Sequence, residues 1–246
     1  MNKDNDIIKR FTELRNKSRD CFIFTEFLSP EESSLVYRAA YENEFTLSGG
    51  FDDAERVVIR FGNKDELGYE IPFPIALMQI SPLNKKFSDT LSHRDYLGAL
   101  MNLGIERKML GDIIIKDNEA YVFVLEHMTT YISENLTRVK HTSIKTELIS
   151  ELPEDVRPKY KEDEEIVPSL RIDAIISKIY NLSRGGAKEL FSAGKVFVNS
   201  RLCINPDYQA LENDVISVRG FGKFTYICKS SETKKGNAVI KILKRI

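Results

Sequence analysis

A highly charged stretch two-thirds of the way along the chain constrains the fold most, because it resists burial. Residues 153–165 contain two prolines and a dense run of acidic and basic side chains. Charged groups are almost never fully buried unless they are paired, so a hydrophobic core is not expected to run through this stretch. The sequence therefore predicts an exposed linker, placed at residues 158–166, between a large front part and a smaller C-terminal part.

The two sides of this linker carry opposite net charges. From Pro168 to Ile246 there are 14 lysines and arginines against six acidic residues, whereas residues 1–167 hold 22 against 31. The formal charge of the whole chain is only −1, so the total hides this division. A basic part on an otherwise acidic chain suggests a polyanionic partner for that part, although an acidic protein or a lipid could also meet it.

Hydrophobic periodicity and turn signals divide the rest of the chain into three α+β segments. Residues 1–71 are expected to form an N-terminal α/β segment, with helices over 7–14 and after a Ser29 cap, and a strand over 56–61. Residues 72–157 predict a strand at 75–80, a helix at 92–102, strands at 112–115 and 121–125, a helix at 127–136 and a long strand at 138–149. That order is typical of RRM-like and ferredoxin-like α+β sandwiches.

The third segment, residues 167–246, predicts two helices followed by a small β layer. The first helix covers 170–179, and the second runs from a Ser183 cap to Gly194, which is well placed to end it in the left-handed conformation. A strand at 195–198 follows, then a turn at Asn199-Ser200 and strands at 215–218, 224–229 and 238–244.

Basic side chains in this third segment occupy predicted exposed positions. Arg184 and Lys188 are four residues apart, so a helix presents them on one face, opposite its apolar side. Arg171 begins the first helix, while Lys195 and Arg201 flank the following hairpin. Helix N-termini add amide donors, and arginine offers a planar fork that suits phosphate. A single such residue would indicate an ordinary solvated surface, but the set together with the local basic excess predicts binding to nucleic acid.

The same segment resembles the S4 RNA-binding domain. The matching residues are Leu170-Arg171-Ile172-Asp173, Ser183-Arg184, Ala187, Leu190, Gly194, Val196, Val198-Asn199 and Val215-Ile216-Ser217-Val218. Gly185-Gly186 departs from the usual bulkier pair, and Asn199-Ser200-Arg201 departs from the usual Asn-Gly-Lys turn. The resemblance implies a helix pair and hairpin that sit on structured ribosomal or transfer RNA. The expected RNA-binding residues are Arg171, Ser183, Arg184, Lys188, Lys195, Asn199 and Arg201.

Residues further upstream extend the resemblance over nearly the whole chain. Gly49-Gly50-Phe51-Asp52-Asp53-Ala54-Glu55-Arg56, the run 92–100, and the stretches 103–105 and 111–113 are similar to the YlmH family of bacterial S4 proteins. That family is related to RqcP, an S4 protein of ribosome-associated quality control. The resemblance implies binding to an obstructed large ribosomal subunit through rRNA and tRNA, in support of the extension of a stalled nascent chain.

Signals for catalysis are weak. His93-Arg94-Asp95 copies the catalytic tripeptide of protein kinases, but Leu100 stands where a kinase needs asparagine, and the glycine-rich loop and DFG motif are missing. The tripeptide is interpreted as the start of a helix, with a secondary RNA contact by His93 and Arg94 as an alternative. An S4-linked RNA-modifying enzyme would need a catalytic domain after the S4 domain or a glycine-rich cofactor turn.

The expected protein is therefore a non-catalytic RNA-binding protein without cofactor or small-molecule substrate. Two other functions stay open: an RNA-modifying enzyme or accessory factor, and a protein-binding scaffold linked to cell division that uses the acidic front half. Three scattered cysteines, Cys21, Cys203 and Cys228, form no CxxC pair, so a zinc site is not expected. The cysteines and the polar N-terminal run indicate a cytoplasmic protein without a membrane partner, expected to be monomeric.

Overall fold

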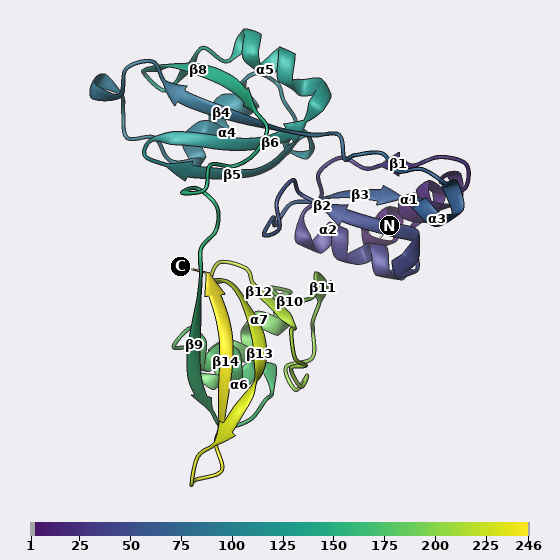
Figure 1. Cartoon of the computed structure of the whole chain (residues 1–246), viewed down its shortest axis with the longest axis vertical. Coiled ribbons are helices and arrows are strands. Elements are labelled where there is room, and N and C mark those ends of the chain that lie inside the picture. Colours follow the sequence, from purple (N-terminus) through teal and green to yellow (C-terminus); the bar gives the residue numbers. More distant parts are fainter. Residues whose placement is uncertain (1–2, 246) are drawn as a thin grey trace. The chain divides into compact units, whose positions relative to one another are not determined.

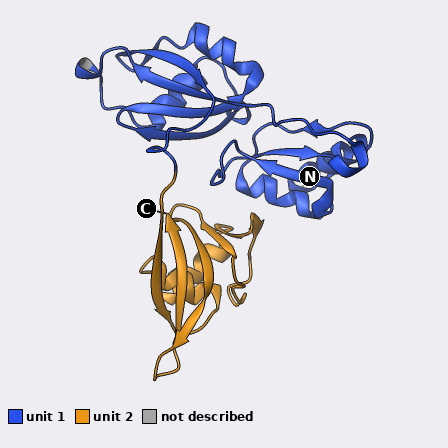
Figure 2. Ribbon diagram, in the orientation of Figure 1, with its two compact units in different colours: residues 1–157 blue, residues 158–246 orange. Residues whose placement is uncertain are grey.

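The computed structural model describes residues 3–245, which form a mixed α and β protein (Figure 1). Residues 1–157 belong to one compact unit and residues 158–246 to a second (Figure 2). Among the described residues, no helix is both long enough and apolar enough to cross a membrane. Each unit has its own hydrophobic core and is described by itself below.

Unit 1 begins with a helix packed against a small antiparallel sheet. The helix α1 (Lys3–Lys17) buries Phe11, which contacts the ring of Phe61. The sheet has the order β1-β3-β2 and is formed by β1 (Ile23–Phe24), β2 (Phe45–Ser48) and β3 (Val58–Phe61). Two short helices, α2 (Pro30–Ser34) and α3 (Lys64–Leu67), complete this part. The predicted cap of α2 is confirmed, because the amide of Glu32 donates to Oγ of Ser29 at 3.3 Å.

The rest of unit 1 has the predicted order of elements. It consists of β4 (Ile75–Pro82), α4 (His93–Asn102), β5 (Leu110–Lys116), β6 (Glu119–Leu125), α5 (Thr129–Asn135), β7 (Arg138–Val139) and β8 (Thr142–Ile149). The antiparallel sheet has the order β5-β6-β4-β8-β7. The prediction of one long strand over 138–149 was wrong. Lys140 has a φ of 51°, a left-handed backbone that turns the chain, so β7 and β8 form a hairpin.

Both faces of this sheet are buried. One face packs on α4 and α5 through Met78, Ile80, Val122 and Val124. The other face carries Leu77, Tyr121, Phe123 and Leu125, and it is covered by residues from outside the sandwich: Phe27, Phe51, Val58, Leu152 and Val156. The rings of Phe51 and Phe123 stack with their centroids 4.9 Å apart. The predicted division between the segments 1–71 and 72–157 therefore lies within unit 1, where residues of both segments share a hydrophobic core.

A polar cluster ties the N-terminal part of unit 1 to strand β5. The Asp112 carboxylate accepts hydrogen bonds from the amides of Glu55 and Arg56 at 2.6 and 3.3 Å. The Arg56 guanidinium donates to the carbonyls of Leu110 and Phe27, each at 3.0 Å. Burial raises the pKa of Asp112 and lowers the pKa of the neighbouring Arg107 to about 10. These contacts involve charged groups, so they fix the two parts more firmly than neutral hydrogen bonds would.

Unit 2 packs two helices on one antiparallel sheet. The helices are α6 (Ile172–Ile179) and α7 (Arg184–Ser192). The sheet has the order β11-β10-β12-β13-β14-β9, formed by β9 (Tyr160–Val167), β10 (Val196–Val198), β11 (Arg201–Leu202), β12 (Val215–Val218), β13 (Gly222–Glu232) and β14 (Ala238–Arg245). The turn between β10 and β11 is confirmed, because Asn199 and Ser200 have φ angles of 49° and 64°. Gly194 ends α7 with a φ of 65°, as predicted.

The prediction of a linker at residues 158–166 was wrong. Most of this stretch forms β9, which pairs with β14 in an antiparallel ladder from Tyr160 to Val167. Two acidic side chains of β9 have basic partners, since Lys241 of β14 lies 3.1 Å from Glu162 and Lys178 of α6 lies 3.6 Å from Glu165. The charge run therefore indicated an edge strand with complementary charges, because charged side chains are common on sheet edges.

Candidate nucleic-acid interface

Helix α7 presents a basic face to solvent. The Ser183 hydroxyl accepts a hydrogen bond from the Gly186 amide at 3.0 Å, so the predicted cap that starts the helix is confirmed. Arg184 and Lys188 are exposed, whereas the opposite side of the helix is buried through Ala187, Leu190 and Phe191. Neither cation forms an ion pair with any residue between 3 and 245. Both charges therefore remain available to an external anion.

The hairpin after α7 adds further basic side chains at its edge. Lys195 is exposed, and its backbone is fixed because its amide donates to the Leu190 carbonyl at 2.9 Å. Arg201 is exposed in β11. The predicted RNA contact Asn199 has a different local role, since its amide group donates to Asp214 at 2.7 Å and accepts from the Val215 amide at 2.9 Å. Asn199 thus holds the hairpin against β12.

Arg171 is also engaged within the protein. Its Nε and Nη2 atoms donate to the fully buried carboxylate of Asp173 at 3.0 and 2.7 Å, and its guanidinium also contacts Asp207. The hydrogen bonds that Arg171 donates to Asp173 raise the pKa of Arg171, so this cation stays charged. Of the seven residues expected to bind RNA, Arg184, Lys188, Lys195 and Arg201 are exposed cations. Ser183, Asn199 and Arg171 make contacts that hold the fold.

Two exposed lysines were not recognised as site residues in the sequence. Lys234 and Lys235 lie at the tip of the hairpin between β13 and β14. In the sequence they contributed only to the count of basic residues, because the resemblance to the S4 domain ends before them. A basic pair next to glycine, between two alternating strands, was the signal that could have identified this tip.

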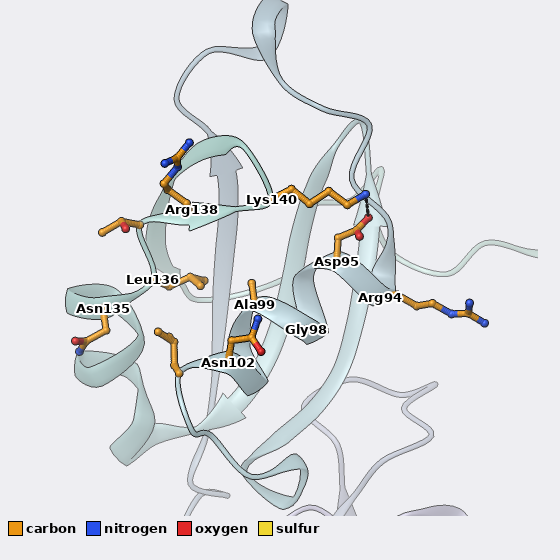
Figure 3. A pocket seen from close by; sticks show the side chains of 11 residues that line it. Arg94, Asp95, Gly98, Ala99, Asn102, Asn135, Leu136, Arg138 and Lys140 are labelled. Atoms are coloured by element: carbon orange, nitrogen blue, oxygen red, sulfur yellow. Dashed lines mark ion pairs between the residues drawn. The ribbon is translucent and has the colours of Figure 1, made fainter.

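A second basic surface lies in unit 1, in a groove of about 550 Å³ beside α4. One wall is α4 itself, and the other is the segment that leads from α5 through β7 (Figure 3). The lining residues are Arg94, Asp95, Gly98, Ala99, Asn102, Leu103, Asn135, Leu136, Thr137, Arg138 and Lys140. In Figure 3 the Arg94 side chain extends away from the floor of the groove at one end, and Arg138 stands on the opposite wall.

The only carboxylate among these lining residues, that of Asp95, is already neutralised. It lies 2.9 Å from Nζ of Lys140, and it accepts hydrogen bonds from the Ser92 amide and hydroxyl at 2.8 and 2.6 Å. The hydrogen bonds from Ser92 and then Lys140 lower the pKa of Asp95 to about 2. The guanidinium groups of Arg94 and Arg138 make no ion pair within the described part of the chain, so the groove is net positive.

The two residues predicted as a secondary RNA contact, His93 and Arg94, have different surroundings in the structure. Arg94 lines the groove, whereas His93 is absent from its lining. Burial lowers the pKa of His93, the charge of Arg107 lowers it further and the charge of Asp112 raises it, so His93 lies beside the polar cluster around Asp112. Between residues 3 and 245, no group of three His, Cys, Asp or Glu side chains is placed to hold a metal ion.

Comparison with known proteins gives similarities in sequence and in structure. Residues 70–151 match a family described as "Putative RNA-binding domain in YlmH". The chain is 28% identical over 224 residues to the ribosome-associated protein quality control protein P2 of Bacillus subtilis, an alignment that covers 86% of this chain and 82% of that protein. A solved structure named cell division protein ylmH, from Streptococcus pneumoniae, superposes with a TM-score of 0.48 and 23% identity, covering 61% of this chain and 93% of that one.

The alignment with the Bacillus protein spans 224 residues, whereas unit 1 covers only residues 1–157. The similarity therefore extends into unit 2. The resemblance to YlmH proteins that the sequence suggested is thereby supported outside the matched domain as well as inside it. An RNA-binding role agrees with the two basic surfaces described above.

Proposed function

Because the chain is a relative of the YlmH proteins, with the RNA-binding domain of that family at residues 70–151, we propose that it binds rRNA and tRNA on the large ribosomal subunit. In this proposal unit 2 is an S4 domain that grips the RNA, and the protein supports quality control of stalled nascent chains. It acts in the cytoplasm as a monomer and performs no chemistry itself.

One observation carries the proposal, namely the α7 face with Arg184 and Lys188. Both are exposed cations without an ion pair among residues 3–245, on a helix whose other side is core. Lys195 and Arg201 extend the basic surface beyond the end of α7. Phosphate contacts of this kind supply most of the sequence-independent affinity for nucleic acid. The name of the Bacillus relative supports the ribosome as the source of that RNA.

The test is sedimentation of the full-length protein with ribosomes from cells in which translation has been stalled. We expect the protein in the large-subunit fractions, and we expect Arg184→Ala combined with Lys188→Ala to move it to the top of the gradient. A matched control is Lys229→Ala, since Lys229 is an exposed cation of the same unit that is already paired with Glu232 at 2.7 Å. Sedimentation of the unchanged protein only at the top of the gradient would contradict the ribosomal role.

A further inference from the structure

In the five-stranded sheet of unit 1, the face with which RRM domains commonly bind RNA is covered by other residues of the protein. RRM domains stack RNA bases on exposed aromatic side chains of their sheet. Here the aromatic side chains of β6 at that face, Tyr121 and Phe123, are 5% and 2% exposed. Residues from the N-terminal part and from 152–156 cover them. An RNA-binding surface on unit 1 must therefore lie elsewhere.

We infer that the groove beside α4 binds a single-stranded segment of RNA, with phosphates contacted by Arg94 and Arg138 and a base lying on the floor at Gly98. This inference adds a second RNA contact to the proposed function and does not depend on the surface of unit 2. The groove lies within the stretch that matches the YlmH RNA-binding domain.

The shape of the groove suits a polymer better than a small molecule. Sites for small ligands are concave, mostly apolar and bury most of their ligand. This groove is open to solvent, and its lining carries three cations against a single carboxylate. Single-stranded nucleic acid is bound in open, positively charged grooves that follow the backbone. The guanidinium groups of Arg94 and Arg138 make no ion pair within the described residues, although Arg138 donates to the His141 carbonyl at 3.3 Å, so both charges can meet the phosphates of such a backbone.

Gly98 lines the groove without placing a side chain in it. A glycine inside a helix is less favourable than alanine because its backbone is more mobile in the unfolded chain. A Cβ added at Gly98 would meet no atom within 4 Å, so packing inside the protein does not require glycine at this position. Its neighbours along the lining, Ala99 and Asn102, leave the helix surface open, and Asn102 can read a base edge.

An aromatic side chain lies near the groove, outside its lining residues. The hydroxyl of Tyr131 on α5 donates to the carbonyl of Leu103, a lining residue, at 2.9 Å, and the tyrosine is 43% exposed. A fixed, exposed ring next to a basic groove is the arrangement on which unpaired bases stack. An acidic peptide would use the arginines but neither the floor nor the ring, so RNA is the better match.

The test uses the full-length chain carrying Arg184→Ala and Lys188→Ala, so that binding by unit 2 is weakened. The probe is a fluorescein-labelled 12-nucleotide oligouridylate, and binding is followed by anisotropy. We expect Arg94→Ala with Arg138→Ala to weaken binding at least about tenfold, because each lost contact is a charge-assisted hydrogen bond. Arg38→Ala is the control, since Arg38 is an exposed arginine of unit 1 outside the groove.

Gly98→Leu is the second variant, because it separates binding from folding. Leucine favours the helix more than glycine does, so the melting temperature should stay or rise while the side chain fills the floor and weakens binding by a similar factor. The same oligouridylate can carry 4-thiouridine for photo-cross-linking. Its cross-links should map to residues 94–103 or 131–140 in the parent chain and disappear in Gly98→Leu.

The inference is overturned if these variants bind the oligouridylate as the parent does, or if all cross-links map to unit 2. It is also overturned if a poly-glutamate peptide binds the parent and loses affinity in these variants while the oligouridylate does not. None of these results bears on the proposed function, which fails if the unchanged protein does not sediment with the large subunit or if Arg184 and Lys188 are dispensable for that binding.

Discussion

Arg171 holds Asp173 in a two-pronged ion pair, in which the Nε and Nη2 atoms lie 3.0 and 2.7 Å from the two carboxylate oxygens. Asp173 is fully buried at the start of α6, and the same guanidinium also contacts Asp207 in the loop after β11. The pair thus joins the first helix of unit 2 to a loop that is distant in sequence. A basic residue expected to bind RNA instead makes contacts that hold unit 2 together.

The first prediction concerns the stability of unit 2. Arg171→Ala would leave the buried Asp173 carboxylate without its partner, and an unpaired buried charge is strongly destabilising. We expect the melting temperature of unit 2 to fall by several degrees, measured by calorimetry. Lys178→Ala removes an exposed ion pair to Glu165 of the same unit and should shift the melting temperature little. Equal melting temperatures for Arg171→Ala and Lys178→Ala would contradict the assignment.

The second prediction concerns the covered sheet of unit 1. Phe123 is 2% exposed and stacks on Phe51, so Phe123→Ala should lower the free energy of unfolding of unit 1 by about 3–5 kcal/mol. If the sheet were instead an open platform for bases, the same change would weaken RNA binding and leave stability intact. Chemical denaturation and oligouridylate binding, measured on the same preparation, distinguish the two cases.

Local features of this fold could be predicted from the sequence, whereas distant contacts could not. The caps at Ser29 and Ser183, the left-handed Gly194 and the Asn199-Ser200 turn depend on residues within a few positions of each other, and all are present. Strand β9 was missed because its partner β14 lies about 80 residues away, and its acidic side chains alone resemble a solvated linker.

The candidate site shows the same limit. Exposure of Arg184 and Lys188 followed from helical spacing against an apolar face, and the structure has both on the surface. The pairing of Arg171 with Asp207 depends on the path of the loop after β11, which no local pattern indicates. The groove beside α4 also escaped prediction, because α4 and the β7 turn meet only in the folded sandwich.

The third prediction is a pH dependence at the groove. The folded state holds the pKa of Asp95 at about 2, below its ordinary value of 3.8, through Ser92 and Lys140. The stability from this carboxylate is therefore fully present above pH 3.8 and is lost as the pH falls toward 2, because the unfolded chain takes up the proton first. The melting temperature of Asp95→Asn should lie below that of the parent by a smaller margin at pH 2 than at pH 5. A difference between variant and parent that is the same at both pH values would contradict this account.

The last prediction concerns the proposed contact between α7 and RNA. If Arg184 and Lys188 contact phosphates, Arg184→Ala should weaken binding to structured RNAs of different sequence alike, because phosphate contacts carry no sequence information. The slope of log affinity against log salt should also decrease by somewhat under one for each lost contact. Arg184→Lys should restore binding only in part if the contact is bidentate, because an ammonium group cannot reproduce the guanidinium fork.

The melting temperature separates this role from a structural one. The Arg184 side chain is exposed and makes no ion pair within residues 3–245, whereas the buried side of α7 rests on Ala187, Leu190 and Phe191. Arg184→Ala should therefore unfold at the temperature of the parent protein. An Arg184→Ala protein that melts early yet keeps full RNA affinity and an unchanged salt slope would show that this arginine serves the fold, as Arg171 does.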